Sequence, residues 1–169
     1  MNQSASDKIQ IERFQLSIFE PFLDLQPRAS DLVSRMVELE ISSGLSSRGI
    51  DSYLSIASQP AHLILLARRG KELSGLVGVL AACIVLDELQ IDNLAVHPDF
   101  RGQGIGTRLV STGLDLARQE GCGIAILEVR SSNGPARNLY RKAGFEDAGK
   151  RPGYYQNPPD DAITMLCQF

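Results

Sequence analysis

The sequence has few cysteines and no pattern among them, which excludes two ways of building a small protein. Its 3 cysteines are an odd number and lie far apart, at positions 83, 122 and 167. Neither a disulfide framework nor a zinc-ligand spacing is visible in Cys83, Cys122 and Cys167. We expect free, buried thiols, and a reducing, cytoplasmic location follows from that expectation.

Long apolar runs and an excess of positive charge are also absent. No stretch approaches the ~20 apolar residues that a membrane-spanning helix needs. The opening MNQSASDKIQ lacks the basic and apolar regions of a signal peptide. We therefore expect no membrane partner and a flexible tail over residues 1–8. A net charge of -3 argues against direct nucleic-acid binding, which depends on Lys and Arg that neutralise phosphates.

Length and composition favour one domain. A chain of 169 residues with 43% hydrophobic content is large enough for a single core, and no repeat or long linker divides it. We predict a single domain over residues 1–169, as a monomer or homodimer. His62 and His97 have no neighbouring ligand residues, so no metal is expected.

The first third is the hardest part to interpret. Residues 11–19 fit a strand, and residues 31–41 carry apolar residues at helical spacing, with Asp31 as a plausible cap. Residues 42–49 are typical of a loop.

The middle of the chain predicts antiparallel strands. Residues 62–67 and 76–86 are β-prone runs separated by turn-forming residues 69–72, which indicates a hairpin. Residues 89–96 predict a further strand. Pro98 ends it, because proline cannot donate to a sheet ladder.

A helix and a central strand are predicted next. The apolar face of the helix consists of Ile105, Leu109, Gly113 and Leu116. Gly121 ends this helix, and residues 123–130 form a short apolar run that suits a central strand.

A second helix has well-marked limits. Asn133 fits its N-cap, Pro135 its first turn and Gly144 the position just past its end. Residues 145–150 and 162–169 fit two late strands, with the residues between them as a loop. Together these elements predict an α/β fold with a mixed sheet.

The most informative stretch is LAVHPDFRGQGIGTRLV, residues 94–110, where a strand runs through a glycine-containing loop directly into an amphipathic helix. Amides at a helix N-terminus have no intrahelical acceptor and carry partial positive charge, so a phosphate is stabilised there. Gly102, Gly104 and Gly106 let the backbone approach an anion closely. The loop does not match the P-loop fingerprint or the dinucleotide-binding fingerprint. Taken alone, the loop also fits an ordinary turn with chance glycines.

The segment RGQGIG, residues 101–106, resembles the Arg/Gln-x-x-Gly-x-Gly/Ala signature of the GNAT superfamily of acetyltransferases, and LAVHP before it also fits. The later segments LEVRSSNGPARNLYRKAGF and RPGYY are similar to the N-terminal-protein acetyltransferase branch, above all the bacterial ribosomal-protein alanine N-acetyltransferases. The resemblance covers residue 76 to the C-terminus. It implies the GNAT fold: a mixed, mostly antiparallel sheet, splayed at the cofactor site and flanked by helices.

The resemblance also implies acetyl-coenzyme A as co-substrate. Loop amides would hold its pyrophosphate, the preceding strand would pair with its pantetheine arm, and Asn133 would contact it. The implied cofactor-binding residues are Leu94, Ala95, Val96, Arg101, Gly102, Gln103, Gly104, Ile105, Gly106, Thr107 and Asn133. Arg101 and Arg108 are candidates for neutralising the phosphates. The alternative is that each is an ordinary solvated charge near the helix end.

Transfer of an acetyl group to an amine needs a neutral nitrogen, and deprotonation near pH 7 costs roughly 1 kcal/mol for an α-amine but nearer ~5 for lysine. Glu128 is the candidate base, because a carboxylate in an otherwise apolar strand is costly without a purpose. A pair with Arg130 or another cation is its structural alternative. The family resemblance matches this position to the proton acceptor, and Glu88 and Asp92 are other candidates for the base.

Tyr140 is the candidate acid, which would protonate the coenzyme A sulfur as it leaves. A core aromatic is the alternative, whereas the resemblance gives the tyrosine of Asn-Leu-Tyr the acid role. Tyr154 and Tyr155 resemble the peptide-gripping tyrosines of N-terminal acetyltransferases, with hairpin packing as their alternative.

These observations predict an acetyl-coenzyme A-dependent N-acetyltransferase that transfers acetyl directly to a protein N-terminal α-amine. The aromatic-Pro-Trp stretch of the resembling family is missing, and the chain has no tryptophan at all. A small-molecule amine is therefore the alternative acceptor. A non-catalytic acetyl-coenzyme A sensor is the alternative from another class.

Overall fold

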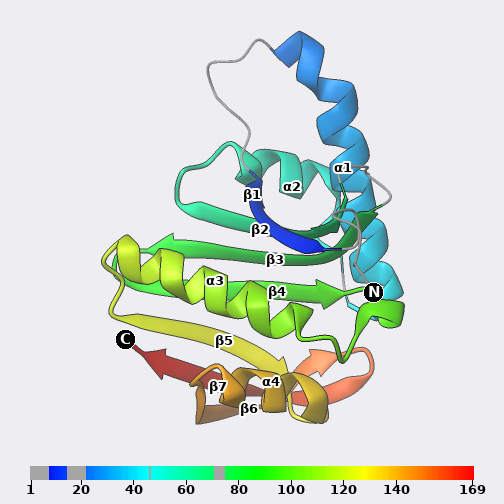
Figure 1. Ribbon diagram of the computed structural model, residues 1–169. Coiled ribbons are helices and arrows are strands. Elements are labelled where there is room, and N and C mark those ends of the chain that lie inside the picture. The colour runs from blue at the N-terminus through cyan, green and yellow to red at the C-terminus, as the bar shows by residue number, and fades with distance from the viewer. Residues whose placement is uncertain (1–7, 15–21, 46, 71–74) are drawn as a thin grey trace, which may run out of the picture.

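The computed structural model describes residues 8–14, 22–45, 47–70 and 75–169. A seven-stranded sheet with the strand order β1-β2-β3-β4-β5-β7-β6 runs through its centre (Figure 1). Strands β4 and β5 are parallel, and all other neighbours are antiparallel. The strands are β1 (Ile9–Phe14), β2 (His62–Arg69), β3 (Leu76–Val85), β4 (Glu88–Val96), β5 (Ile124–Arg130), β6 (Glu146–Gln156) and β7 (Pro159–Gln168). The predicted mixed, mostly antiparallel sheet is confirmed.

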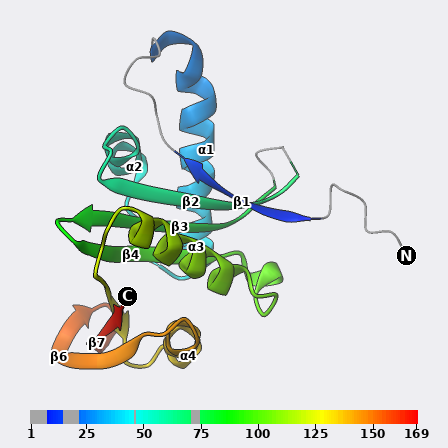
Figure 2. The same ribbon diagram turned by 60° about the vertical axis from the view of Figure 1, so that its left-hand side comes forward.

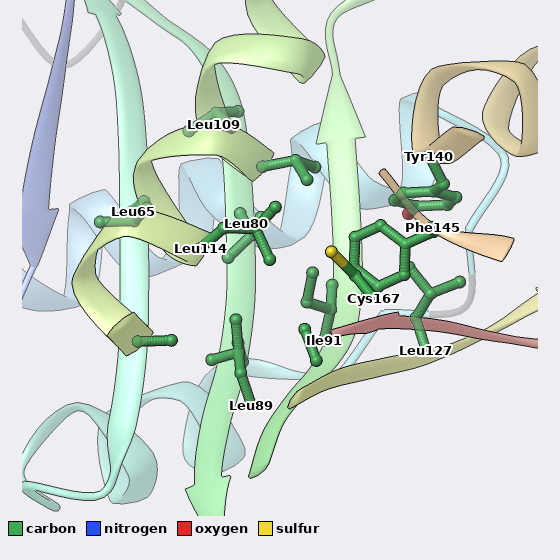
Figure 3. Close-up of a cluster of buried hydrophobic side chains, with 14 of the residues drawn as sticks. Leu65, Leu80, Leu89, Ile91, Leu109, Leu114, Leu127, Tyr140, Phe145 and Cys167 are labelled. Atoms are coloured by element: carbon green, nitrogen blue, oxygen red, sulfur yellow. The ribbon is translucent and has the colours of Figure 1, made fainter. Parts of the chain in front are cut away.

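Helices cover both faces of the sheet. Helices α3 (Ile105–Gln119) and α4 (Gly134–Lys142) lie on one face, and α1 (Phe22–Ser42) and α2 (Ile50–Ala57) on the other (Figures 1 and 2). Each face has its own buried apolar cluster, and Figure 3 shows the one beneath α3 and α4. Among the described residues, no helix is long and apolar enough to cross a membrane.

The burial of the central elements follows from their sequence patterns. Strands β2 and β3 are almost continuously apolar, because residues on both faces of the sheet are covered. Helix α3 buries the predicted Ile105, Leu109 and Gly113. Leu116 is only partly buried, and Gly106, Val110, Leu114 and Ala117 complete the inward face instead.

The N-terminal third differs from the prediction in two respects. Helix α1 begins at Phe22, so Asp31 lies inside the helix and does not cap it. Helix α2 has no counterpart among the predicted elements. Strand β1 ends at Phe14, and the remainder of the strand predicted to residue 19 lies outside the described residues. The same holds for residues 1–7 of the predicted tail and for part of the turn at residues 69–72.

The late loop predicted over residues 151–161 is wrong. These residues belong mostly to β6 and β7, which pair Arg151 with Ala162 and Tyr155 with Asp160. Strand β6 is exposed along nearly its whole length, so no alternating apolar pattern marks it. The glycine and prolines of this segment lie in the irregular part of the hairpin and at its turn.

The parallel pair β4 and β5 is joined only at one end. Its register stops at Ile91↔Leu127, although β4 continues to Val96 and β5 to Arg130. Beyond this point the two strands diverge (Figure 1). The splayed sheet that the family resemblance implied is therefore present.

A bulge in β4 coincides with the point of separation. Ala81 of β3 pairs with Asn93, but its neighbour Ala82 pairs with Ile91. Asp92 is thus the extra residue on β4. A bulge of this kind bends and twists its strand, which accounts for the direction that β4 takes away from β5.

Candidate active site

A glycine-containing loop joins the end of β4 to α3. A short 3₁₀ helix, η3 (Pro98–Phe100), follows β4, and Nδ1 of His97 accepts a hydrogen bond from the Asp99 amide at 3.3 Å. Gly102 and Gly104 then adopt left-handed φ angles of 74° and 76°. Such angles cost a residue with a Cβ about 1–2 kcal/mol. A Cβ at either glycine would meet no atom within 4 Å, so the backbone conformation explains their identity.

The N-terminus of α3 offers free backbone donors. Gly104 occupies the N-cap and supplies no side-chain cap, and the amide of Arg108 makes its bond to the Gly104 carbonyl at 3.0 Å. The amides of Ile105, Gly106 and Thr107 precede that bond and have no intrahelical acceptor. With the positive end of the helix dipole, they form a site that suits a phosphate.

The loop is held by packing at one end and by an arginine at the other. A Cβ on Gly106 would lie 2.7 Å from Cδ1 of Leu139, so α3 and α4 approach closely there. Arg101 donates from Nε to the Val96 carbonyl at 3.1 Å and from Nη2 to the Ser43 carbonyl at 3.4 Å. Arg101 therefore ties the loop to both β4 and the end of α1.

A hollow of about 560 Å³, here called the cofactor-side hollow, lies against this loop. All but two of the predicted cofactor-binding residues line it: Leu94, Val96, Arg101, Gly102, Gly104, Ile105, Gly106, Thr107 and Asn133. Asn133 also caps α4, since its side-chain oxygen accepts from the Ala136 amide at 3.1 Å. The predicted N-cap is confirmed.

Two predicted cofactor residues lie elsewhere. The side chain of Ala95 is buried in the cluster under α1 and α2, and the side-chain nitrogen Nε2 of Gln103 donates to the Asp99 carbonyl at 3.3 Å. Arg108 also lies outside the hollow and donates to the Ile9 carbonyl at 3.1 Å. Its side chain thus secures strand β1.

Sequence reasoning missed two polar residues of α4 that line the cofactor-side hollow, Asn138 and Lys142. They are four residues apart and so share one helix face. Lys142 brings a cation to a cleft that is otherwise lined mainly by backbone and apolar groups. Once Asn138 is placed in the hollow, helical spacing identifies Lys142.

A second hollow of about 440 Å³, here called the amine-side hollow, continues the first. Leu45, Leu94, Asn133 and Ala136 line both. It contains three of the predicted catalytic and substrate-binding residues, Glu128, Tyr140 and Tyr155, together with the alternative base Asp92. The other alternative, Glu88, pairs with Ile124 at the closed end of the parallel pair and does not line the hollow.

Glu128 is partly buried on β5 and forms an ion pair. Its Oε1 accepts from Nη1 of Arg151 at 2.6 Å, and 27% of its side chain remains exposed. The partner is therefore Arg151 of β6 rather than Arg130. Glu128 nevertheless lines the amine-side hollow, so the ion pair positions the carboxylate without removing it from the cleft.

Tyr140 is buried, and its ring packs edge-on against Phe145 at 5.8 Å (Figure 3). Within the described part of the chain, its hydroxyl has no hydrogen-bond partner. Burial, with a smaller effect of Tyr155, raises the pKa of Tyr140 above that of an ordinary phenol. The residue therefore keeps its proton at neutral pH and carries a hydroxyl available for a ligand in the hollow.

The two late tyrosines have different surroundings. Their rings meet edge-on at 5.1 Å, but Tyr155 lines the amine-side hollow whereas Tyr154 does not. Burial, and then Glu128, raises the pKa of Tyr155. A hydrogen bond with the Glu128 carboxylate raises the pKa of Tyr154. The structure thus brings Tyr155 to the cleft and places Tyr154 beside the Glu128–Arg151 pair.

The cleft combines a phosphate site with a gap between two strands and, past that gap, a carboxylate and a phenol. In the described ranges, no group of three or more His, Cys, Asp or Glu residues is placed to hold a metal ion. The free helix amides fit a diphosphate, and the open edge of β4 fits an extended arm that carries amides. These features suit coenzyme A and its thioester.

Comparison with known proteins defines the class. The acetyltransferase (GNAT) family model matches residues 33–145, which is more than half of the chain. The protein belongs to the GNAT acetyltransferase family, and it is an N-acetyltransferase with acetyl-coenzyme A as co-substrate.

Two relatives and one crystal structure show which N-acetyltransferases the chain is similar to. A Bacillus subtilis protein, whose name marks it as a candidate ribosomal protein bS18-alanine N-acetyltransferase, is 36% identical over 135 residues, 79% of this chain and 87% of the relative. The ribosomal protein bS18-alanine N-acetyltransferase of Escherichia coli K12 is 40% identical over 84 residues, 48% of this chain and 57% of the relative. The crystal structure of the Escherichia coli ribosomal-protein-S18-alanine N-acetyltransferase shares the fold, with a TM-score of 0.74, 24% identity and coverage of 95% and 94%.

Proposed function

We propose that this enzyme acetylates the α-amine of a protein N-terminus, with Glu128 as the base and Tyr140 as the acid. The observation that carries the proposal is the continuity of the two hollows across the open end of the β4–β5 pair. A donor held by its diphosphate on α3 would place its thioester at the junction. The amine-side hollow then presents Glu128 and Tyr140 to the reacting atoms.

The reaction needs two proton transfers on opposite sides of the thioester. The amine nitrogen attacks the carbonyl carbon and gives its proton to Glu128. The carbon–sulfur bond breaks, and the departing sulfur takes a proton from Tyr140, which leaves an amide and free coenzyme A. No acyl-enzyme is required. The raised pKa of Tyr140 keeps the phenol protonated at neutral pH, so the proton is present when the carbon–sulfur bond breaks.

A protein N-terminus suits this cleft better than a lysine side chain does. Its amine is about a tenth neutral near pH 7, so a carboxylate base suffices. Tyr155, which lines the amine-side hollow, offers a phenol that can hydrogen-bond a peptide backbone, and the ring of Tyr154 packs against it. The names of the relatives support the same acceptor class, and a ribosomal protein would place the enzyme in the cytoplasm.

The test is to incubate the purified protein and acetyl-coenzyme A with three acceptors and to follow free thiol and product mass. The acceptors are a peptide with a free N-terminal alanine, the same peptide with a blocked N-terminus and one internal lysine, and a set of small amines. We expect acetylation of the free peptide alone. Turnover of small amines alone would favour a small-molecule enzyme, and cofactor binding without any product would favour a sensor.

A further inference from the structure

The described residues between α1 and α2 form a wall that both hollows share. Ser43 and Leu45 line the cofactor-side hollow, and Gly44, Leu45 and Arg48 line the amine-side hollow. Arg48 is the charged member of this wall.

Arg48 is fixed by two carboxylates from different elements. Its Nη2 lies 2.7 Å from Oδ2 of Asp92, the extra residue of the β4 bulge. Its backbone amide donates to Oε2 of Glu40 at 3.1 Å. Burial raises the pKa of Asp92, whereas Arg48 lowers it, so the guanidinium offsets the cost of a half-buried carboxylate beside the cleft.

Glu40 is a fully buried anchor for this wall. None of its surface is exposed, which would be costly for a carboxylate without partners. The hydroxyl of Tyr53 and the side-chain amide of Asn93 both donate to its Oε1, and the Arg48 amide donates to Oε2. An ionised carboxylate only accepts hydrogen bonds, so this set of three donors matches it. The donors come from α2, β4 and the connecting segment, which are thereby held together.

The other arginines near the amine-side hollow are committed to protein groups. Arg130 donates from its two terminal nitrogens to the carbonyls of Pro158 and Asn157 at 2.9 and 3.0 Å. Arg151 pairs with Glu128. A guanidinium carries five N–H donors, and the pair with Asp92 engages one terminal nitrogen of Arg48. Of the two described arginines that line this hollow, Arg130 has both terminal nitrogens engaged, whereas Nη1 of Arg48 has no partner among the described residues.

We propose that Arg48 is an acceptor-recognition residue whose guanidinium donates to a carbonyl oxygen in the first peptide units of the acceptor. The inference rests on the proposed function, because it assigns a role within the same cleft. A peptide presents a carbonyl close to its α-amine, whereas a simple alkylamine presents none. Arg48 therefore makes the cleft selective for amines that carry a neighbouring carbonyl.

The test compares wild type with Arg48→Met, using a peptide with a free N-terminus and a primary alkylamine as substrate or, at high concentration, as competitive inhibitor of the peptide. Loss of a hydrogen bond from a charged donor should raise KM for the peptide about tenfold. The kcat, the KM for acetyl-coenzyme A and the KM or inhibition constant of the alkylamine should stay unchanged. Arg48→Lys keeps the charge and a donor, so it should recover part of the loss.

Tyr53→Phe is the matched control, because it removes a different hydrogen bond to Glu40 and leaves the bond to Arg48. It should lower the melting temperature without changing KM for the peptide. The inference is overturned if Arg48→Met leaves KM for the peptide unchanged, weakens both acceptors equally, or is matched by Tyr53→Phe. If wild type does not acetylate the peptide, the proposed function fails and the inference fails with it; if wild type does, the inference is judged on the variants alone.

Discussion

The two hollows of the cleft are lined by different kinds of chemical group. The cofactor-side hollow is formed by glycines, backbone amides and apolar side chains, with Lys142 and Arg101 as its charged lining residues. The amine-side hollow is formed by ionisable side chains from segments far apart in the chain, among them Asp92, Glu128 and Tyr140. The comparison indicates that donor binding depends on backbone conformation, whereas the chemistry and the choice of acceptor depend on side chains.

Glu128→Gln should have the largest effect. The variant cannot accept the proton of the amine, so kcat should fall by roughly 10²–10³ at pH 7, within the usual range for a general base. Part of the rate should return as the pH rises above the α-amine pKa of ~8, because the amine then arrives neutral. Initial rates of thiol release across a pH series would check this, with the KM for acetyl-coenzyme A as the control. A wild-type rate at pH 7 would assign the base elsewhere, with Asp92 next.

Tyr140→Phe should lower kcat by roughly 10- to 100-fold at little cost in stability. The ring contact with Phe145 survives, and the lost hydroxyl has no partner among the described residues. Rate and melting temperature measured on one preparation would separate the two effects. A large drop in melting temperature with no change in rate would make Tyr140 a structural residue.

Gly104→Ala tests the cofactor-side hollow. Alanine at a φ of 76° is strained by about 1–2 kcal/mol, and relief of that strain should displace the helix amides. We expect KM for acetyl-coenzyme A to rise about 3- to 10-fold with little change in kcat. Gly121→Ala is a matched control, since Gly121 has a φ of 85° and open space for a Cβ but lies past the far end of α3. An equal change in KM for both variants would contradict the proposed cradle.

Asp147→Asn should have the smallest effect. It should leave both hollows unchanged, because Asp147 lines neither of them. Arg137, and then Arg141, holds the pKa of Asp147 below its ordinary value, at distances of 2.6 and 2.9 Å. A lowered pKa contributes stability above the unfolded value of ~3.9, and that contribution is lost as the pH falls through the folded pKa. The variant should melt at most a few degrees lower at pH 7, and the difference should fade below about pH 4. Calorimetry at several pH values would check this, with unchanged kinetics as the control.

The elements with strong local signals were predictable from the sequence. The strand, loop and helix from β4 through α3 follow from an apolar run, a proline stop and a helical apolar face. The cap of α4 at Asn133 follows from its residue type and the proline after Gly134. These features depend on neighbours along the chain, so a single sequence contains them.

The parts that depend on distant contacts were not predictable. Strand β6 lacks an alternating pattern because it is exposed nearly throughout, and its pairing with β7 is what makes it a strand. The Glu128–Arg151 pair joins strands through a hairpin that was expected to be a loop. The carboxylate of Glu40 brings together donors from α2, β4 and the segment between the helices. No residue spacing in the sequence predicts these contacts.

The separation of β4 from β5 leaves two strand edges facing each other inside the sheet. Beyond Ile91, the side of β4 turned toward β5 has no strand partner in the described chain. Its amides should therefore exchange hydrogen with solvent faster than those of β3, which is paired on both sides. A donor whose own amides bond to β4 would act as a temporary extra strand, so acetyl-coenzyme A should slow this exchange and fasten the two halves of the sheet together.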